Sequence, residues 1–216
     1  MGALNRFVAD TIAGSICGFT RFITGAQARW IGCAPVPAKR VYFGNHASHA
    51  DFVLIWASLP AQLRRAVRPV AGADYWDQGA IRRYLIHEVL NGVLIDRGNP
   101  GASGENPIET MTNVLDAGQS LIFFPEGTRN TTDEMLLPFK SGLFRIASAR
   151  PEVELVPVWM ENQGRVLPKG ETIPVPLLCS INFGVPLQIG AQETKVDFLA
   201  RARGALLELA QSVRPS

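Results

Sequence analysis

A chain of 216 residues is long enough for one domain with a substantial core, and its 47% hydrophobic and 19% charged residues are typical of a globular protein. The net charge of +2 and the lack of a basic stripe interleaved with aromatic residues do not indicate a nucleic-acid partner. The three cysteines, Cys17, Cys33 and Cys179, are odd in number and far apart, which argues against a disulfide framework or a zinc site and favours free thiols in a reducing compartment.

The N-terminal residues 2–25 are apolar but are interrupted by Arg6, Asp10 and Arg21, so no run reaches the ~20 apolar residues that a membrane-spanning helix needs. Apolar residues recur at steps of three or four, which predicts an amphipathic helix. The apolar stripe consists of Leu4, Val8, Ile12, Ile16, Phe19 and Ile23. Such a helix either lies in a membrane interface or packs on its own domain, and the periodicity leaves both open. The basic residues nearby favour membrane contact.

Beyond a Pro-containing break at residues 33–39, short apolar runs alternate with longer periodic segments. The predicted strands are residues 41–44, 67–71, 93–97, 120–124, 155–160 and 181–183. The predicted helices are residues 52–59, 76–90, 106–117, 140–149 and 192–213. This alternation predicts an α/β fold, in which a mostly parallel mixed sheet is flanked by helices. We therefore expect an N-terminal amphipathic helical arm over residues 1–35 and a single domain over residues 36–216, with its sites at the carboxyl ends of the strands.

Residues 45–51, Asn-His-Ala-Ser-His-Ala-Asp, follow a predicted strand and contain a candidate catalytic pair. His46 is a candidate general base, because the imidazole pKa lies near neutral pH, and Asp51 can fix its tautomer and stabilise the imidazolium. The HX4D spacing places both residues near the start of a helix. Alternatively, Ser48 and Asp51 form a capping box, in which the serine hydroxyl caps that helix. His46 and His49 lack the i, i+4 spacing of a zinc motif, so we expect no metal.

Residues 124–129, Phe-Pro-Glu-Gly-Thr-Arg, predict a tight turn after a strand. Pro125 restricts φ, and Gly127 permits backbone conformations that other residues resist. A turn of this kind presents N–H groups to an oxyanion or a phosphate, and Arg129 adds positive charge. Glu126 can order the loop by pairing with a nearby cation. The alternative interpretation is a rigid surface turn that binds nothing.

Two further cations lie at the ends of predicted elements. Arg97 ends a strand, where a guanidinium can bind a phosphate through two parallel hydrogen bonds. A surface salt bridge, for example with Asp96, explains Arg97 as well when it is considered alone. Lys140 begins a predicted helix and either reaches the same pocket or is solvated.

Four blocks occur in order along the chain. They are Asn45-His-x-Ser-x-x-Asp51, Ile95-Asp-Arg97, Phe124-Pro-Glu-Gly-Thr-Arg129 and Val156-Pro-Val158. In these blocks the chain resembles the PlsC-type glycerolipid acyltransferases, also called lysophospholipid acyltransferases. The first and third blocks are specific, whereas the second and fourth carry weight only through their order. The chain departs from the commonest pattern at Asn130, where serine is more usual, and in the less aromatic Leu94-Ile-Asp96.

The resemblance implies an O-acyltransferase that moves a fatty acyl group from acyl-CoA or acyl-carrier protein to the free hydroxyl of a lysophospholipid. The first acceptor it suggests is 1-acylglycerol 3-phosphate, which would give phosphatidic acid. The catalytic pair is then His46 and Asp51, and Pro157 lies near the acyl donor. The residues expected to bind the acceptor are Arg97, Glu126, Gly127, Thr128, Arg129 and Lys140. No cofactor is expected beside the acyl thioester co-substrate.

Other functions stay open at this point. The acceptor is alternatively another lyso-lipid, such as lyso-ornithine lipid. A non-catalytic lipid-binding scaffold on the same fold, or a hydrolase that uses His46 to activate water, would share these motifs. The presence of both His46 and Asp51 favours the enzyme. We expect it to lie at the cytoplasmic face of the inner (cell) membrane as a peripheral or monotopic protein, with the membrane surface and its two substrates as partners.

Overall fold

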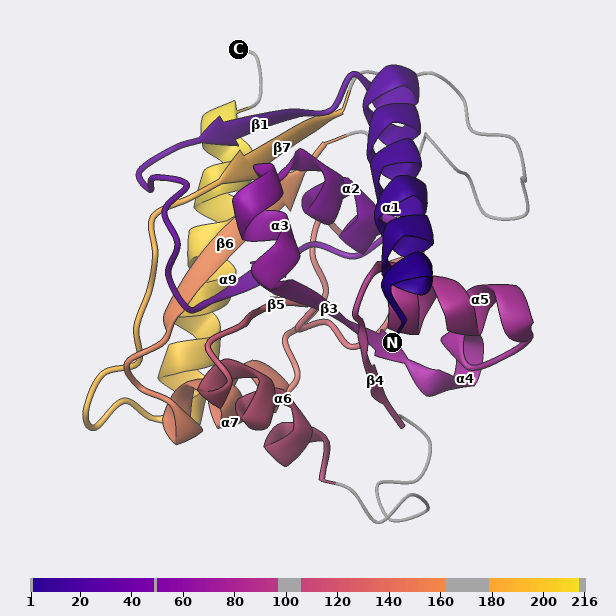
Figure 1. Cartoon of the computed structure of the whole chain (residues 1–216). Helices are drawn as coiled ribbons and strands as arrows, with labels where there is room; N and C mark the ends of the chain where they lie inside the picture. Colours follow the sequence, from indigo (N-terminus) through magenta and orange to yellow (C-terminus); the bar gives the residue numbers. More distant parts are fainter. Residues whose placement is uncertain (1, 49, 97–105, 162–178, 214–216) are drawn as a thin grey trace.

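The computed structural model describes residues 2–48, 50–96, 106–161 and 179–213. Within these residues one seven-stranded sheet has the strand order β1-β7-β6-β2-β5-β3-β4 (Figure 1). The strands are β1 (Gln27–Trp30), β2 (Arg40–Gly44), β3 (Val67–Gly72), β4 (Val93–Ile95), β5 (Ser120–Phe123), β6 (Glu154–Met160) and β7 (Ser180–Phe183). Five of them, β2 to β6, run parallel to one another, whereas β6 and β7 pair antiparallel. The predicted α/β fold with a mostly parallel mixed sheet is confirmed.

Helices cover both faces of this sheet, which explains why its central strands are mostly apolar. The helices are α1 (Ala3–Thr24), α2 (Asp51–Ser58), α3 (Ala61–Ala66), α4 (Ala73–Trp76), α5 (Ala80–Tyr84), α6 (Pro107–Asp116), α7 (Gly142–Ala149) and α9 (Lys195–Val213). One core cluster joins the sheet to α1 and α2, and the other joins it to α6, α7 and α9 (Figure 1). All five residues of β2 are buried between these layers.

Helix α1 has two apolar faces, one packed on the domain and the other exposed. Ala9 and Cys17 are buried against the domain, and Ile12 and Ile16 pack partly against the same core. The opposite face is exposed. Its large apolar side chains are Leu4 (77% exposed), Phe7 (70%), Val8 (40%), Phe19 (60%) and Phe22 (85%). Among the described residues, no helix combines the length and apolar character that a membrane crossing requires.

The expected boundary at residue 35 differs from the observed architecture. Residues 27–30, which we assigned to the arm, form the edge strand β1 and pair in parallel with β7. The segment Gln-Ala-Arg-Trp is only half-buried, as an edge strand should be, and therefore lacks a strong apolar signal. The arm is thus built into the sheet of the main domain.

The predicted helix over residues 76–90 is divided in the structure. Helix α4 ends at Trp76, and α5 begins after Gly79, whose positive φ of 79° interrupts the helical conformation. The chain then continues through the π-helical turn η1 (Leu85–Val89). Helix α4 directly follows the carboxyl end of β3 and therefore lies next to the motif residues.

The carboxyl ends of β2 and β5 lie side by side, because Phe43 and Phe123 are partners in the sheet. The first motif follows β2 and the second follows β5. The fold therefore brings the two blocks together at one sheet edge, where α/β proteins commonly bind ligands.

Candidate active site

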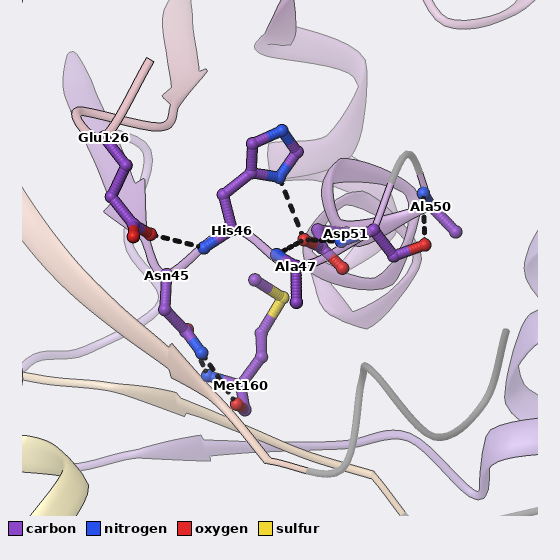
Figure 2. A network of polar contacts seen from close by, with 8 residues as sticks. Asn45, His46, Ala47, Ala50, Asp51, Glu126 and Met160 are labelled. Atoms are coloured by element: carbon purple, nitrogen blue, oxygen red, sulfur yellow. Dashed lines mark hydrogen bonds and ion pairs between the residues drawn. The ribbon is translucent and has the colours of Figure 1, made fainter. Parts of the chain in front are cut away.

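His46 and Asp51 form a buried pair at the carboxyl end of β2 (Figure 2). The Nδ1 atom of His46 lies 2.9 Å from Oδ2 of Asp51, and the two side chains are 7% and 0% exposed. A carboxylate accepts hydrogen bonds, so Nδ1 carries the proton and Nε2 is left as the basic nitrogen. The arrangement can therefore take a proton from a hydroxyl at Nε2 and stabilise the imidazolium that forms.

The carboxylate of Asp51 also organises the turn that carries His46. The same Oδ2 accepts hydrogen bonds from the N–H groups of Ala47 at 2.6 Å and Ser48 at 2.8 Å. The capping box considered above is not formed, because α2 begins at Asp51 with Ala50 as its N-cap and without a side-chain cap. The hydroxyl of Ser48 instead accepts from the N–H of Ala50 at 3.2 Å. One carboxylate oxygen thus orients His46 and also fixes the turn that precedes α2.

Glu126 lies behind the catalytic turn rather than in front of it. Its carboxylate is 1% exposed, and Oε1 accepts from the N–H of His46 at 2.7 Å while Oε2 accepts from the N–H of Leu137 at 2.9 Å. Burial raises the pKa of Glu126, and these two hydrogen bonds oppose that rise. Among the described residues no lysine or arginine bonds to Glu126, so this placement does not support our expectation that Glu126 pairs with a cation or contacts the acceptor.

Asn45 holds the other side of the turn, a role that sequence reasoning missed. Its Nδ2 donates to the carbonyl of Met160 at 3.0 Å, and its Oδ1 accepts from the N–H of Met160 at 2.9 Å (Figure 2). The amide therefore imitates one more residue of the β2–β6 pairing. An amide side chain directly after a buried strand is the sequence signal for such a role.

A hollow of about 340 Å³ opens in front of His46. Its polar wall contains Asp96, Lys140 and Ser141. Its apolar wall contains Val70, Ile95, Ile108, Met111, Phe123 and Phe124. A second, much narrower hollow also borders His46 and is lined by aromatic residues of α2 and α4, namely Phe52, Tyr75 and Trp76. The site thus offers both a cation and apolar surface beside the base, as an amphiphilic substrate requires.

The turn over residues 125–127 contributes backbone and one glycine to this hollow. Gly127 adopts a positive φ of 66°, and its N–H donates to the carbonyl of Phe124 at 3.0 Å. That N–H, like those of His46 and Ala47, is already engaged, so it is not a free donor for an oxyanion. Lys140 is exposed at the rim, with its side chain against Gly127.

The remaining predicted residues are placed differently. Thr128 is exposed and Arg129 half-buried, and neither lines the two hollows beside His46. Pro157 is buried in β6 opposite Phe43, and it lines neither hollow. Arg97, like His49, lies outside the described residues.

The chain is similar in sequence and fold to proteins named as acyltransferases. The model of the Acyltransferase family matches residues 32–161. The 1-acyl-sn-glycerol-3-phosphate acyltransferase of Cocos nucifera is 30% identical over 168 residues, which cover 70% of this chain and 52% of that protein. The enzyme of the same name from Haemophilus influenzae is 27% identical over 173 residues, which cover 68% of this chain and 66% of that protein.

The crystal structure of the 1-acyl-sn-glycerophosphate (LPA) acyltransferase PlsC from Thermotoga maritima has the same fold. It superimposes with a TM-score of 0.72 at 18% identity, covering 98% of this chain and 83% of that chain. The chain spans about half the length of the first curated relatives it matches, 52% of the Cocos nucifera protein and 56% of that from Limnanthes douglasii. Because the family model covers more than half of the chain, and the matched region contains both motifs, this protein belongs to the acyltransferase family.

Proposed function

We propose that this chain is an O-acyltransferase that moves a fatty acyl group from the thioester of CoA or acyl-carrier protein to the free hydroxyl of 1-acylglycerol 3-phosphate, giving phosphatidic acid. The observation that carries the proposal is the placement of His46, oriented by Asp51, in the same hollow as Lys140. The names of the matched relatives support this acceptor.

The transfer needs one proton relay at His46. Nε2 takes the proton from the acceptor hydroxyl as its oxygen attacks the thioester carbonyl. The new C–O bond forms, the C–S bond breaks, and the imidazolium returns the proton to the departing sulfur. Asp51 stabilises the imidazolium in between.

No cysteine of the chain is suited to act as a covalent nucleophile. Burial raises the pKa of the Cys179 thiol to about 11, and burial also raises the pKa of the Cys17 and Cys33 thiols. A thiol that stays protonated is a poor nucleophile, and none of the three lines the hollows beside His46. We therefore assign direct attack by the acceptor oxygen.

Lys140 is the described residue that we assign to the acceptor phosphate. It lies at the rim of the hollow, and α7 begins two residues later, so the positive end of a helix dipole reinforces its charge. The apolar wall of the hollow then receives acyl chain. Arg97 and Arg129 stay predictions for the same phosphate.

We further propose that the enzyme works on a membrane surface. The exposed apolar face of α1, which carries Phe7, Phe19 and Phe22, suits a membrane interface, and the exposed Arg6 adds positive charge on the same helix. All three cysteines are unpaired, which fits a reducing compartment and thus the cytoplasmic face of the cell membrane.

The test is thiol release from an acyl-CoA in the presence of 1-acylglycerol 3-phosphate, with phosphatidic acid quantified as product. We expect His46→Ala to lower kcat by ~10²–10⁴-fold, because the base is lost. Asp51→Asn should also be severe, since a neutral amide oxygen can accept the same hydrogen bonds but lacks the negative charge that stabilises the imidazolium. His87→Ala is the matched control, because His87 is exposed and lies outside both hollows.

Three outcomes would contradict the proposal. Thioester cleavage at the same rate without acceptor would identify a hydrolase. Lipid binding without turnover, in both the wild type and His46→Ala, would identify a scaffold. A preference for phosphate-free acceptors, such as lyso-ornithine lipid, would remove the role given to Lys140.

A further inference from the structure

Glu126 is the buried acid of the site that the proton relay does not use. It follows Pro125 and precedes Gly127, and both neighbours line the hollow beside His46, whereas Glu126 does not. Its side chain points back into the protein and is 1% exposed. An acceptor in the hollow therefore has no direct path to this carboxylate.

The two carboxylate oxygens join two separate segments of backbone. One oxygen receives the N–H of His46 at 2.7 Å, and the other receives the N–H of Leu137 at 2.9 Å (Figure 2 shows the first bond). A carboxylate is the side chain that can accept from two N–H groups at once with negative charge on both oxygens. A neutral amide has one acceptor oxygen and would turn an N–H₂ group toward the second N–H.

The backbone of His46 is held from other sides as well. Its carbonyl accepts from the N–H of Asn130 at 2.6 Å, and the preceding Asn45 is paired with Met160 on β6. Glu126, which follows β5, adds the hydrogen bond to the N–H of His46. The position of the imidazole thus depends on the backbone of His46, which is held at its N–H, at its carbonyl and through the preceding residue Asn45.

We propose that Glu126 is a positioning residue, which fixes the backbone of His46 so that Nε2 meets the acceptor hydroxyl, and that it is not a ligand of the acceptor. The kinetic part of this inference rests on the proposed function. A small displacement of a catalytic base is costly, because a shift of about 1 Å can cost ~10²-fold in rate.

The test compares Glu126→Gln with Arg203→Gln. Arg203 holds the same loop from the opposite side, since its Nη2 donates to the carbonyl of Leu136 at 2.6 Å, but it does not contact His46. We expect Glu126→Gln to lower kcat by ~10²-fold while KM for 1-acylglycerol 3-phosphate stays within about twofold. Arg203→Gln should leave both within about threefold of wild type.

Glu126→Asp is the second variant, because it keeps the charge but is one methylene too short to reach both N–H groups. We expect its kcat to lie between those of the wild type and Glu126→Gln. A tenfold rise of the acceptor KM at unchanged kcat would instead make Glu126 an acceptor ligand, as the family resemblance implied. An equal loss of kcat in Arg203→Gln would assign the effect to the loop rather than to His46.

A measurement without turnover separates this inference from the proposed function. Amide hydrogen exchange by NMR should show that the N–H of His46 exchanges at least about tenfold faster in Glu126→Gln, because its acceptor is lost. The ring ¹⁵N signals of His46 should shift as well. Unchanged exchange and ring signals would overturn the inference, whether or not the wild type transfers acyl groups.

Discussion

The imidazole of His46 lies flat against the ring of Phe124, with the ring centroids 4.3 Å apart and an angle of 13° between the planes. Phe124 opens the second motif, so this stack joins the two blocks directly. It covers one face of the base, while Asp51 holds Nδ1 in the ring plane. The imidazole therefore keeps little freedom apart from the edge that carries Nε2.

Replacing Phe124 with leucine should lower kcat by about tenfold, because a stacked pair contributes about 0.5–1.5 kcal/mol of orientation that leucine cannot supply. The measurement is steady-state kinetics, together with thermal unfolding. Phe144→Leu is the control, since Phe144 packs on Phe198 away from His46. Equal kcat values for the two variants would show that the stack has no part in orienting the base.

Gly127→Ala should raise KM for 1-acylglycerol 3-phosphate several-fold. A Cβ at Gly127 would lie 2.7 Å from Cδ of Lys140, so the lysine must move from the rim of the hollow. Gly118→Ala is the matched control, because Gly118 also has a positive φ, 79°, but a Cβ there meets nothing within 4 Å. Both changes should cost about 1–2 kcal/mol of stability through the backbone conformation. If both raised KM alike, displacement of Lys140 would not be the cause.

Replacing Phe19 and Phe22 together with serine should weaken binding to vesicles that contain anionic phospholipid. Each phenylalanine is at least 60% exposed, so the fold gains little from it and the thermal midpoint should change little. Vesicle co-sedimentation measures the effect. Val196→Ser provides the comparison, because Val196 is 71% exposed on α9, away from α1. If the double variant sedimented with vesicles as the wild type does, α1 would not be part of the membrane-binding surface.

Glu193 predicts an acid-dependent part of the stability. Hydrogen bonds from Arg201 lower its pKa from 4.5 to about 2, so the folded protein keeps this carboxylate ionised where the unfolded chain would bind a proton. The stabilisation is complete above pH 4.5 and is lost as the pH falls toward about 2. Because Arg201 is exposed, solvent screening keeps the contribution to about 1 kcal/mol or less.

Glu193→Gln should accordingly lower the melting temperature by about 2–4 °C or less at neutral pH. The difference from the wild type should shrink as the pH falls below 4.5. Calorimetry across this range checks the trend, with Glu134→Gln as an exposed control for which the described part of the chain provides no arginine partner. If the difference in melting temperature stayed constant with pH, the ionisation of Glu193 would not be its cause.

Features that depend on neighbouring residues were predictable from the sequence. The spacing from His46 to Asp51 fits within one turn and the start of one helix, so the pair needs no distant partner to form. The buried strands β2, β5 and β6 appear as apolar runs, since helices cover both faces of the sheet.

Features that depend on distant contacts were not predictable. The role of Glu126 follows from a hydrogen bond to a residue 80 positions away, which no local pattern encodes. Strand β1 forms because β7 offers it an edge, although its own residues show little strand character. The motif residue Pro157 lies in the same sheet row as Phe43 and Phe123, but β2 separates it from Phe123, and Pro157 itself lines neither hollow.

Helix α1 ends at Thr24, and after Gly25 and Ala26 the chain is already fastened into the sheet as β1. A hydrogen bond of 3.1 Å from Arg21 to the carbonyl of Ala57 secures the same end of the helix. The short connection from α1 to β1 therefore does not act as a flexible linker. If a bilayer bound the exposed face of α1, it would fix the orientation of the whole domain relative to the membrane. The lipid substrate would then have to diffuse laterally to His46, because α1 could not carry the base toward the bilayer.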